Sequence, residues 1–441
     1  MEPGHPTPWY TMPRVPFKKT NGYRGDQRRA KTDALPFLTR TAMSHPHLPP
    51  EMLDYIVDLL HDKPETLKLC CLVTNSWVPR TRKHLFADIK FDSAVDLALW
   101  KKTFPDPSNS PAYYTHTLSV GCPHAITEAD AEEGGWIRAF SRVSRFVMGG
   151  HFTSIDGSKI PFVPFHKFSP TLKSFRLIST TPLYSEVSNL ICSFPLLEDL
   201  NLTGGDWLLG DDDLHGPQAI PPLTSPAFTG SLELYQMRRM APITHWLLSL
   251  PGGIHFRKLV LPWLHEGDHS LTTALVERCS HTLDSLDIIC SLIRIGKPTW
   301  RLLSHRYLLL PPAQSAPSDL SKATKLKYVT FWLNSWSVEW INAALRTITP
   351  GHRDIQQTSI HIPYYLIIVG ITLRTIEEPI HGEWLGLDRL LVQLWESRSV
   401  RTRVIYTEKR DMRDLVEHLL PETSGRGAID LVYVQHGSQQ I

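Results

Sequence analysis

The chain has 441 residues, of which 42% are hydrophobic and 20% charged, so it is long enough for two or three packed domains. Its formal net charge of +2 argues against broad electrostatic binding of nucleic acid. The longest apolar run, Tyr364–Ile371, is too short to span a membrane, and no secretory signal is recognised. The six cysteines match neither zinc nor disulfide spacing, so we expect reduced thiols and a cytoplasmic or nuclear location.

Residues 1–43 are rich in proline, glycine and basic residues and poor in aliphatic ones, which predicts a disordered basic tail. The basic runs Lys18-Lys19 and Arg28–Lys31 are short and are separated by Gly25 and Asp26. They therefore favour a solvated tail over a nuclear-import or nucleic-acid-binding segment.

The stretch Leu48–Phe91 predicts three short helices. Pro49 and Pro50 suit a helix entrance, and apolar residues then recur at helical spacing. Lys63-Pro64 ends this helix and starts a second one, and a third begins near Thr74. Three helices of this size cannot close a core alone, so their apolar stripes must meet a partner, the rest of the chain, or both.

Residues 44–91 resemble an F-box. The resemblance rests on the entry Leu48-Pro49-Pro50-Glu51, the pair Leu72-Val73, Trp77, and the exit His84-Leu85-Phe86. The phrase LCCLV…SW is most similar to the large fungal class of F-box proteins. This family's helices dock on the Skp-type adaptor of a cullin–RING (SCF-type) ubiquitin ligase, so the resemblance implies a non-catalytic substrate adaptor. The candidate adaptor-facing residues are Leu48, Pro49, Glu51, Ile56, Leu59, Leu67, Leu72, Val73 and Trp77.

After these helices, one short pattern recurs: an apolar residue, two variable ones, then apolar–variable–apolar. Its starts are 25 to 32 residues apart, except for two gaps of 43 and 44. Such alternation predicts short strands with one buried face. The twelve copies are 86–91, 115–120, 143–148, 172–177, 197–202, 229–234, 256–261, 283–288, 326–331, 357–362, 401–406 and 429–434.

Helical patterns lie between these copies, at 93–104, 184–194, 242–250, 271–279, 338–348, 385–395 and 412–420. A strand and a helix in each repeat are typical of a leucine-rich-repeat solenoid. The predicted fold class is therefore α/β, with an F-box followed, over residues 92–441, by an irregular leucine-rich-repeat-like solenoid of short parallel strands backed by helices. An ordinary α/β domain with similar strand spacing is the alternative.

Residues between the buried strand positions are expected to point to an open concave face, where a protein substrate would bind. The mixed signs of this row favour a protein ligand over a phosphate backbone. The inserted loops 204–226 and 291–325 are the alternative substrate-binding elements. The predicted row consists of Arg176, Asn201, Glu233, Val260, Asp287, Thr330 and His361. The row beside it consists of Ser174, Asp199, Ser231, Lys258, Ser285, Tyr328 and Ser359.

One segment formally fits a zinc-protease signature, because His265-Glu266-Gly267-Asp268-His269 reads H-E-x-x-H. That chemistry needs both histidines on one helix face, whereas these residues follow a predicted strand directly and contain a glycine. We therefore expect no metal site, no cofactor and no enzymatic activity. Two rival functions remain: a binding scaffold that uses the F-box without delivering substrates, and a metal-dependent hydrolase at this segment.

Overall fold

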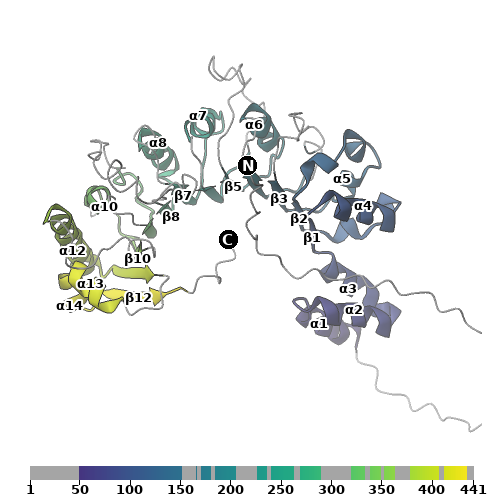
Figure 1. Ribbon diagram of the computed structural model, residues 1–441, viewed down its shortest axis with the longest axis horizontal. Coiled ribbons are helices and arrows are strands. Elements are labelled where there is room, and N and C mark those ends of the chain that lie inside the picture. The colour runs from purple at the N-terminus through teal and green to yellow at the C-terminus, as the bar shows by residue number, and fades with distance from the viewer. Residues whose placement is uncertain are drawn as a thin grey trace, which may run out of the picture. The chain divides into compact units, whose positions relative to one another are not determined.

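The chain forms an α/β fold whose centre is an open, twelve-stranded parallel sheet (Figure 1). No helix in the described part of the chain is both long and apolar enough to cross a membrane. The computed structural model describes residues 49–150, 165, 170–179, 184–204, 226–235, 240–262, 269–289, 319–332, 338–348, 352–362, 378–406 and 412–434.

Three helices precede the sheet: α1 (Pro50–Leu59), α2 (Pro64–Val73) and α3 (Val78–Leu85). Proline occupies an early position in each of them, where a backbone N–H would have no partner within the helix. A 3₁₀ turn, Asn75–Trp77, joins α2 to α3, and the Thr74 side chain caps its first turn. The predicted breaks at Lys63-Pro64 and Thr74 therefore agree with the helix boundaries.

The strand order of the sheet is the order of the chain, β1 to β12, and every neighbouring pair is parallel. Each of the twelve predicted copies overlaps one strand. The strands are β1 Asp88–Phe91, β2 Thr117–Val120, β3 Arg145–Gly150, β4 Ser174–Ser179, β5 Asp199–Thr203, β6 Ser231–Tyr235, β7 Lys258–Pro262, β8 Ser285–Ile289, β9 Tyr328–Trp332, β10 Gln357–Ile362, β11 Arg401–Tyr406 and β12 Ile429–Tyr433.

Helices cover one face of the sheet, and the core lies between the two layers (Figure 1). The seven predicted helical patterns agree with helices to within a few residues, except that α12 (Glu378–Arg398) is longer, whereas α5 (Trp136–Ala139) and α14 (Pro421–Gly425) match no predicted pattern. In the described part of the chain, the helices after β1 are α4 Ala94–Thr103, α5 Trp136–Ala139, α6 Tyr184–Cys192, α7 Ala241–Ser249, α8 His269–Cys279, α10 Val338–Arg346, α12 Glu378–Arg398, α13 Arg413–Leu419 and α14 Pro421–Gly425. The short 3₁₀ helices are Pro107–Asn109, Pro111–Tyr114, Pro123–Ala125 and Glu128–Ala131.

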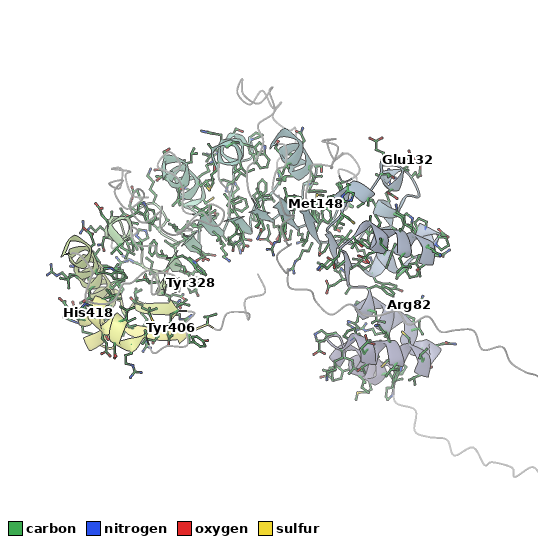
Figure 2. The ribbon with its side chains drawn as sticks, in the orientation of Figure 1. Arg82, Glu132, Met148, Tyr328, Tyr406 and His418 are labelled. Atoms are coloured by element: carbon green, nitrogen blue, oxygen red, sulfur yellow. The ribbon has the colours of Figure 1, made fainter. Side chains whose placement is uncertain are left out.

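Alternation along the strands explains why only one face is covered. In β5 and β6, for example, alternate residues are fully buried and the intervening ones are only partly buried. A parallel sheet that is covered on both faces would instead have nearly continuous apolar strands. We call the face without helices the open face of the sheet. Tyr328, labelled in Figure 2, belongs to this face and is 42% exposed.

The last three copies differ from the predicted alignment. The pattern placed Ile360 and Ile362 at the two core positions of β10, but Thr358 and Ile360 pair with the core residues Val329 and Phe331 of β9. Thr358 is fully buried, and its hydroxyl has no hydrogen-bond partner among the described residues. A buried threonine at a position that is usually aliphatic therefore concealed the true alignment.

The same displacement continues into β11, where Thr402 and Val404 are the residues that pair with Thr358 and Ile360. In β12 the core positions are Ile429 and Leu431, which pair with Thr402 and Val404. The pattern had chosen Val432 instead, because β12 has apolar residues on both of its faces.

Candidate functional site

Helix α1 presents a stripe of exposed apolar side chains. Met52, Tyr55 and Leu59 are 49%, 59% and 58% exposed, and their spacing of three and four residues puts them on one side of the helix. Val57, on the other side, is fully buried. The helix therefore packs by one face and leaves a second apolar face in solvent.

Helix α2 repeats this arrangement more strongly. Leu69, Leu72 and Val73 are 64%, 82% and 67% exposed, whereas Leu67 and Cys70 are buried. Of the thirteen large apolar side chains that are exposed in the described residues, six lie in α1 and α2. Scattered single exposures are ordinary, whereas two stripes within so short a segment form a candidate contact surface.

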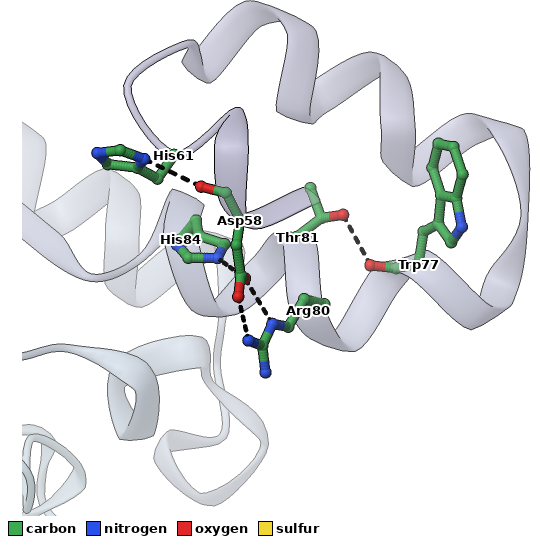
Figure 3. Close-up of polar contacts among 6 residues, drawn as sticks. All are labelled: Asp58, His61, Trp77, Arg80, Thr81 and His84. Carbon is green, nitrogen blue, oxygen red and sulfur yellow. Dashed lines mark hydrogen bonds and ion pairs between the residues drawn. The ribbon is translucent and has the colours of Figure 1, made fainter. Parts of the chain in front are cut away.

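A charged contact joins α1 to α3 (Figure 3). The carboxylate of Asp58 accepts a hydrogen bond of 2.6 Å from Nε of Arg80, and a second Arg80 nitrogen contacts its other oxygen. Nε2 of His84 lies 2.7 Å from Oδ1 of Asp58. Arg80, assisted by His84, holds the pKa of the Asp58 carboxyl well below its usual range. This contact fixes α1 against α3 without using the exposed apolar stripe of α1.

The predicted adaptor-facing residues fall into three groups. Pro49, Glu51, Leu59, Leu72 and Val73 are exposed, and Ile56 and Trp77 are partly buried. Leu67 is 1% exposed, so it packs between the helices and offers no surface to a partner. Leu48 lies outside the described residues.

Three exposed residues were missing from the predicted set: Met52, Tyr55 and Leu69. Their helical spacing with Leu59 and with Leu72 was visible in the sequence, and it is the signal that could have found them.

On the open face, six of the seven predicted row residues are neighbours across strands. The pairs run without a break from Arg176 of β4 through Asn201, Glu233, Val260 and Asp287 to Thr330 of β9. Most are partly buried, but Val260 is only 1% exposed.

His361 does not continue this row. It pairs with Trp332, while Ser359 pairs with Thr330, because of the displacement in β10. The rings of His361 and Trp332 stack at 3.8 Å between centroids and 11° between planes. His361 is 9% exposed, and burial lowers its pKa to about 4, so the imidazole is neutral at physiological pH.

The second predicted row shows the same change at its end. Lys258, Ser285 and Tyr328 are neighbours across strands, but Gln357, rather than Ser359, pairs with Tyr328. At the other end, Asp199 pairs with Ser174 of β4 and accepts hydrogen bonds from the backbone and the hydroxyl of Ser231. The two predicted rows are therefore correct from β4 to β9.

The middle of the open face carries a connected polar network. Glu233 accepts hydrogen bonds from Nδ2 of Asn201 at 2.7 Å and from Nζ of Lys258 at 3.2 Å. The same Nζ lies 4.0 Å from Oδ2 of Asp287, whose pKa is raised by burial. Burial and, secondarily, the charge of Glu233 raise the pKa of Tyr235 to about 12. The network offers donors, acceptors and both signs of charge to a ligand.

Among the described residues, no group of three histidine, cysteine or acidic side chains could hold a metal ion. The segment with the H-E-x-x-H spacing lies mostly outside them: His265 and Glu266 are not described, and His269 is the first residue of α8. Burial raises the pKa of Cys192 to about 11 and that of Cys279 to about 12, so both remain thiols at neutral pH.

Comparison of the chain with protein-family models and with curated proteins finds no match to either.

Proposed function

We propose that this protein is a non-catalytic substrate adaptor of a cullin–RING ubiquitin ligase. Helices α1–α3 act as an F-box that binds a Skp-type adaptor and, through it, a cullin. Residues 92–441 form an irregular leucine-rich-repeat-like solenoid whose open face binds a protein substrate. The observation that carries the proposal is the pair of exposed apolar stripes on α1 and α2, in the segment that resembles an F-box.

The energetics of these stripes favour a partner. Burying a leucine side chain contributes on the order of 1.5–3 kcal/mol, so residues such as Leu72 at 82% exposure leave most of that free energy unused. The Asp58–Arg80 contact already orients α1 against α3, so the stripes are not needed to assemble these helices. An apolar partner surface would therefore gain their full burial.

Adaptor binding is tested by co-expression with a Skp-type adaptor and a pull-down at graded concentrations. The variant Leu72→Asp with Val73→Asp should weaken binding at least about tenfold, because two charges replace apolar contacts. Val95→Asp with Leu99→Asp is the matched control, since these residues of α4 are 73% and 50% exposed. If both double variants bind as the parent does, α2 is not the docking element.

Ligase and scaffold functions differ in what co-purifies. A ligase component should recover a cullin together with the adaptor, whereas a non-ligase scaffold should recover the adaptor alone. Recovery of the adaptor without a cullin, from cells in which both are abundant, would favour the scaffold.

Substrate capture on the open face is tested by proximity labelling. Arg176→Glu with Tyr328→Asp changes one charge and one 42%-exposed aromatic on that face. As a control, Glu277→Lys with Lys322→Glu reverses an ion pair of 2.7 Å between α8 and the segment that precedes β9. We expect the first variant to lose its labelled partners and the second to retain them. If neither variant loses its labelled partners, the loops 204–226 and 291–325 become the candidate substrate-binding elements.

A further inference from the structure

The two edge strands of the sheet, β1 and β12, differ in how well they are protected from pairing with a further strand. At the β1 end, the core-facing residues Ile89 and Phe91 are 8% and 4% exposed. The ring of Phe91 packs edge-on against Trp100 of α4, with 5.7 Å between centroids. The intervening residues of this four-residue strand, Asp88 and Lys90, are charged. Short length and charge are two of the usual means by which proteins keep an edge strand from pairing further.

The β12 end has less of this protection, because its five-residue strand carries one charged residue and its core-facing side chains are less well covered. Ile429 and Leu431 are only partly buried, although their partners in β11, Thr402 and Val404, are 1% and 0% exposed. Tyr433 is 40% exposed. Asp430 is the one charged residue of the strand, and it is bound by Arg401 at 3.2 Å. The core therefore ends on an apolar row that is half covered.

The backbone of β12 shows what could cover this row. Backbone hydrogen bonds join both ends of β12 to β11. The N–H of Thr402 donates to the carbonyl of Ala428, and the N–H of Val434 donates to the carbonyl of Tyr406. Because backbone groups alternate in direction, Ile429, Leu431 and Tyr433 point their N–H and C=O groups away from β11. Groups at this spacing are matched by another extended strand.

We propose that the free edge of β12 pairs with β12 of a second copy, in an antiparallel arrangement about a twofold axis through Leu431. In this register Leu431 faces its own counterpart and Ile429 faces Tyr433 of the other copy. All three of these pairs are of the type that exchanges two hydrogen bonds, so every outward backbone group of β12 is satisfied. Their side chains lie on the core side of both sheets and complete the apolar layer.

Charge and symmetry are compatible with this pairing. Asp430 faces Val432 of the other copy, so like charges are not directly opposed, and each aspartate keeps its own Arg401. Because the β1 end is better protected, β12 is the one free sheet edge among the described strands, and an association through it closes at two copies instead of growing into a fibre. The inference is independent of the proposed ligase function.

Residues 435–441 are a poorer partner for the edge. Their sequence, Gln-His-Gly-Ser-Gln-Gln-Ile, contains one apolar residue, so it cannot reproduce the alternating apolar row of β12. A chain that ends at Val434 separates these two possibilities, because it removes the tail and leaves the strand intact.

The test is sedimentation equilibrium of the full chain, combined with amide hydrogen exchange. We expect a reversible dimer with a Kd of about 1–100 μM, as suits a small interface. Tyr433→Lys should raise this Kd at least about tenfold, because it puts a charge opposite Ile429. Tyr328→Lys is the matched control, since Tyr328 is 42% exposed but lies on an interior strand. The chain that ends at Val434 should dimerise as the parent does.

Hydrogen exchange measures the pairing without any substitution. The amides of Ile429, Leu431 and Tyr433 should become protected as the protein concentration rises. Four results would each overturn the proposal: a monomer at about 100 μM, a dimer unchanged by Tyr433→Lys, protection of these amides that does not depend on concentration, or dimerisation only after residues 435–441 are removed. The last would show that the tail occupies the edge of the intact chain.

Discussion

Helices α2 and α10 have similar lengths and similar apolar contents, yet they use their apolar residues in opposite ways. Helix α10 buries six of its nine residues against the rest of the fold, including Trp340 and Ile341. Helix α2 buries two of its ten residues and leaves Leu69, Leu72 and Val73 in solvent. The difference lies in what each helix packs against: Trp340 of α10 packs edge-on against Phe331 of β9, at 6.1 Å between ring centroids, whereas α2 packs mainly against α3. Apolar residues thus stabilise the fold in one region and remain available for a partner in the other.

The largest effect that would test this comparison is expected in α10. Ile341 is fully buried, so Ile341→Ala removes apolar contacts and leaves a cavity. The free energy of unfolding should fall by about 2–5 kcal/mol. Urea denaturation measures it, and a loss below about 0.5 kcal/mol would show that α10 does not rely on burial against the sheet.

Acid should destabilise the sheet region before it affects α1–α3. Burial lowers the pKa of His361 from 6.5 to about 4, so between these values the unfolded chain binds a proton that the folded chain excludes. The contribution of the neutral His361 side chain to the free energy of unfolding is complete above pH 6.5. As the pH falls toward 4 this contribution is lost, and the free energy of unfolding decreases by at most about 3 kcal/mol.

Denaturation curves across this pH interval measure the effect. His361→Gln should flatten the pH dependence, whereas His255→Gln, at an exposed position, is the control that should leave it as in the parent. An equal slope in the parent and in His361→Gln would show that another group is responsible.

A smaller effect is expected from the charged contact between α1 and α3. Asp58→Ala removes the partner of Arg80 and His84, and the side chain of Asp58 is 35% exposed, so solvent weakens the pair. We expect a loss of about 0.5–1 kcal/mol. The lowered pKa of Asp58 means that this contribution is present above pH 3.8 and is lost as the pH falls further. Glu51→Ala, an exposed change in the same helix, is the control.

The smallest effect on stability is expected for Leu72→Ala. At 82% exposure, this side chain makes few contacts within the chain, so the free energy of unfolding should change by less than about 0.5 kcal/mol. Paired with Ile341→Ala, this measurement gives the comparison of α2 with α10 directly. A large loss from Leu72→Ala would mean that the exposed stripe of α2 already has a partner within the protein.

The sequence was most informative where periodicity and burial coincide. The strands up to β9 could be aligned in register because each has aliphatic or aromatic residues at both core positions, such as Leu232 and Leu234. The alignment failed at β10 because Thr358 fills a core position, and at β12 because Val432 and Leu431 are equally apolar. A pattern of residue types does not report burial of a polar side chain or apolar residues on both faces of one strand.

The candidate site was harder to predict than the fold. The sequence indicated that α1 and α2 are amphipathic, but it could not show that Leu67 packs inwards while Leu69 is 64% exposed. That distinction depends on the angles between α1, α2 and α3. The Asp58–Arg80 contact, which spans 22 positions in the chain, contributes to these angles and follows from no local pattern.

The agreement between strand order and chain order has a consequence for synthesis. Each strand from β2 onward pairs with the strand that leaves the ribosome just before it. Pairing never waits for a distant segment, so the sheet can grow one strand at a time, and the cost of loop closure stays close to that of a single repeat. The growing edge is therefore exposed at every stage of translation until the next strand pairs with it.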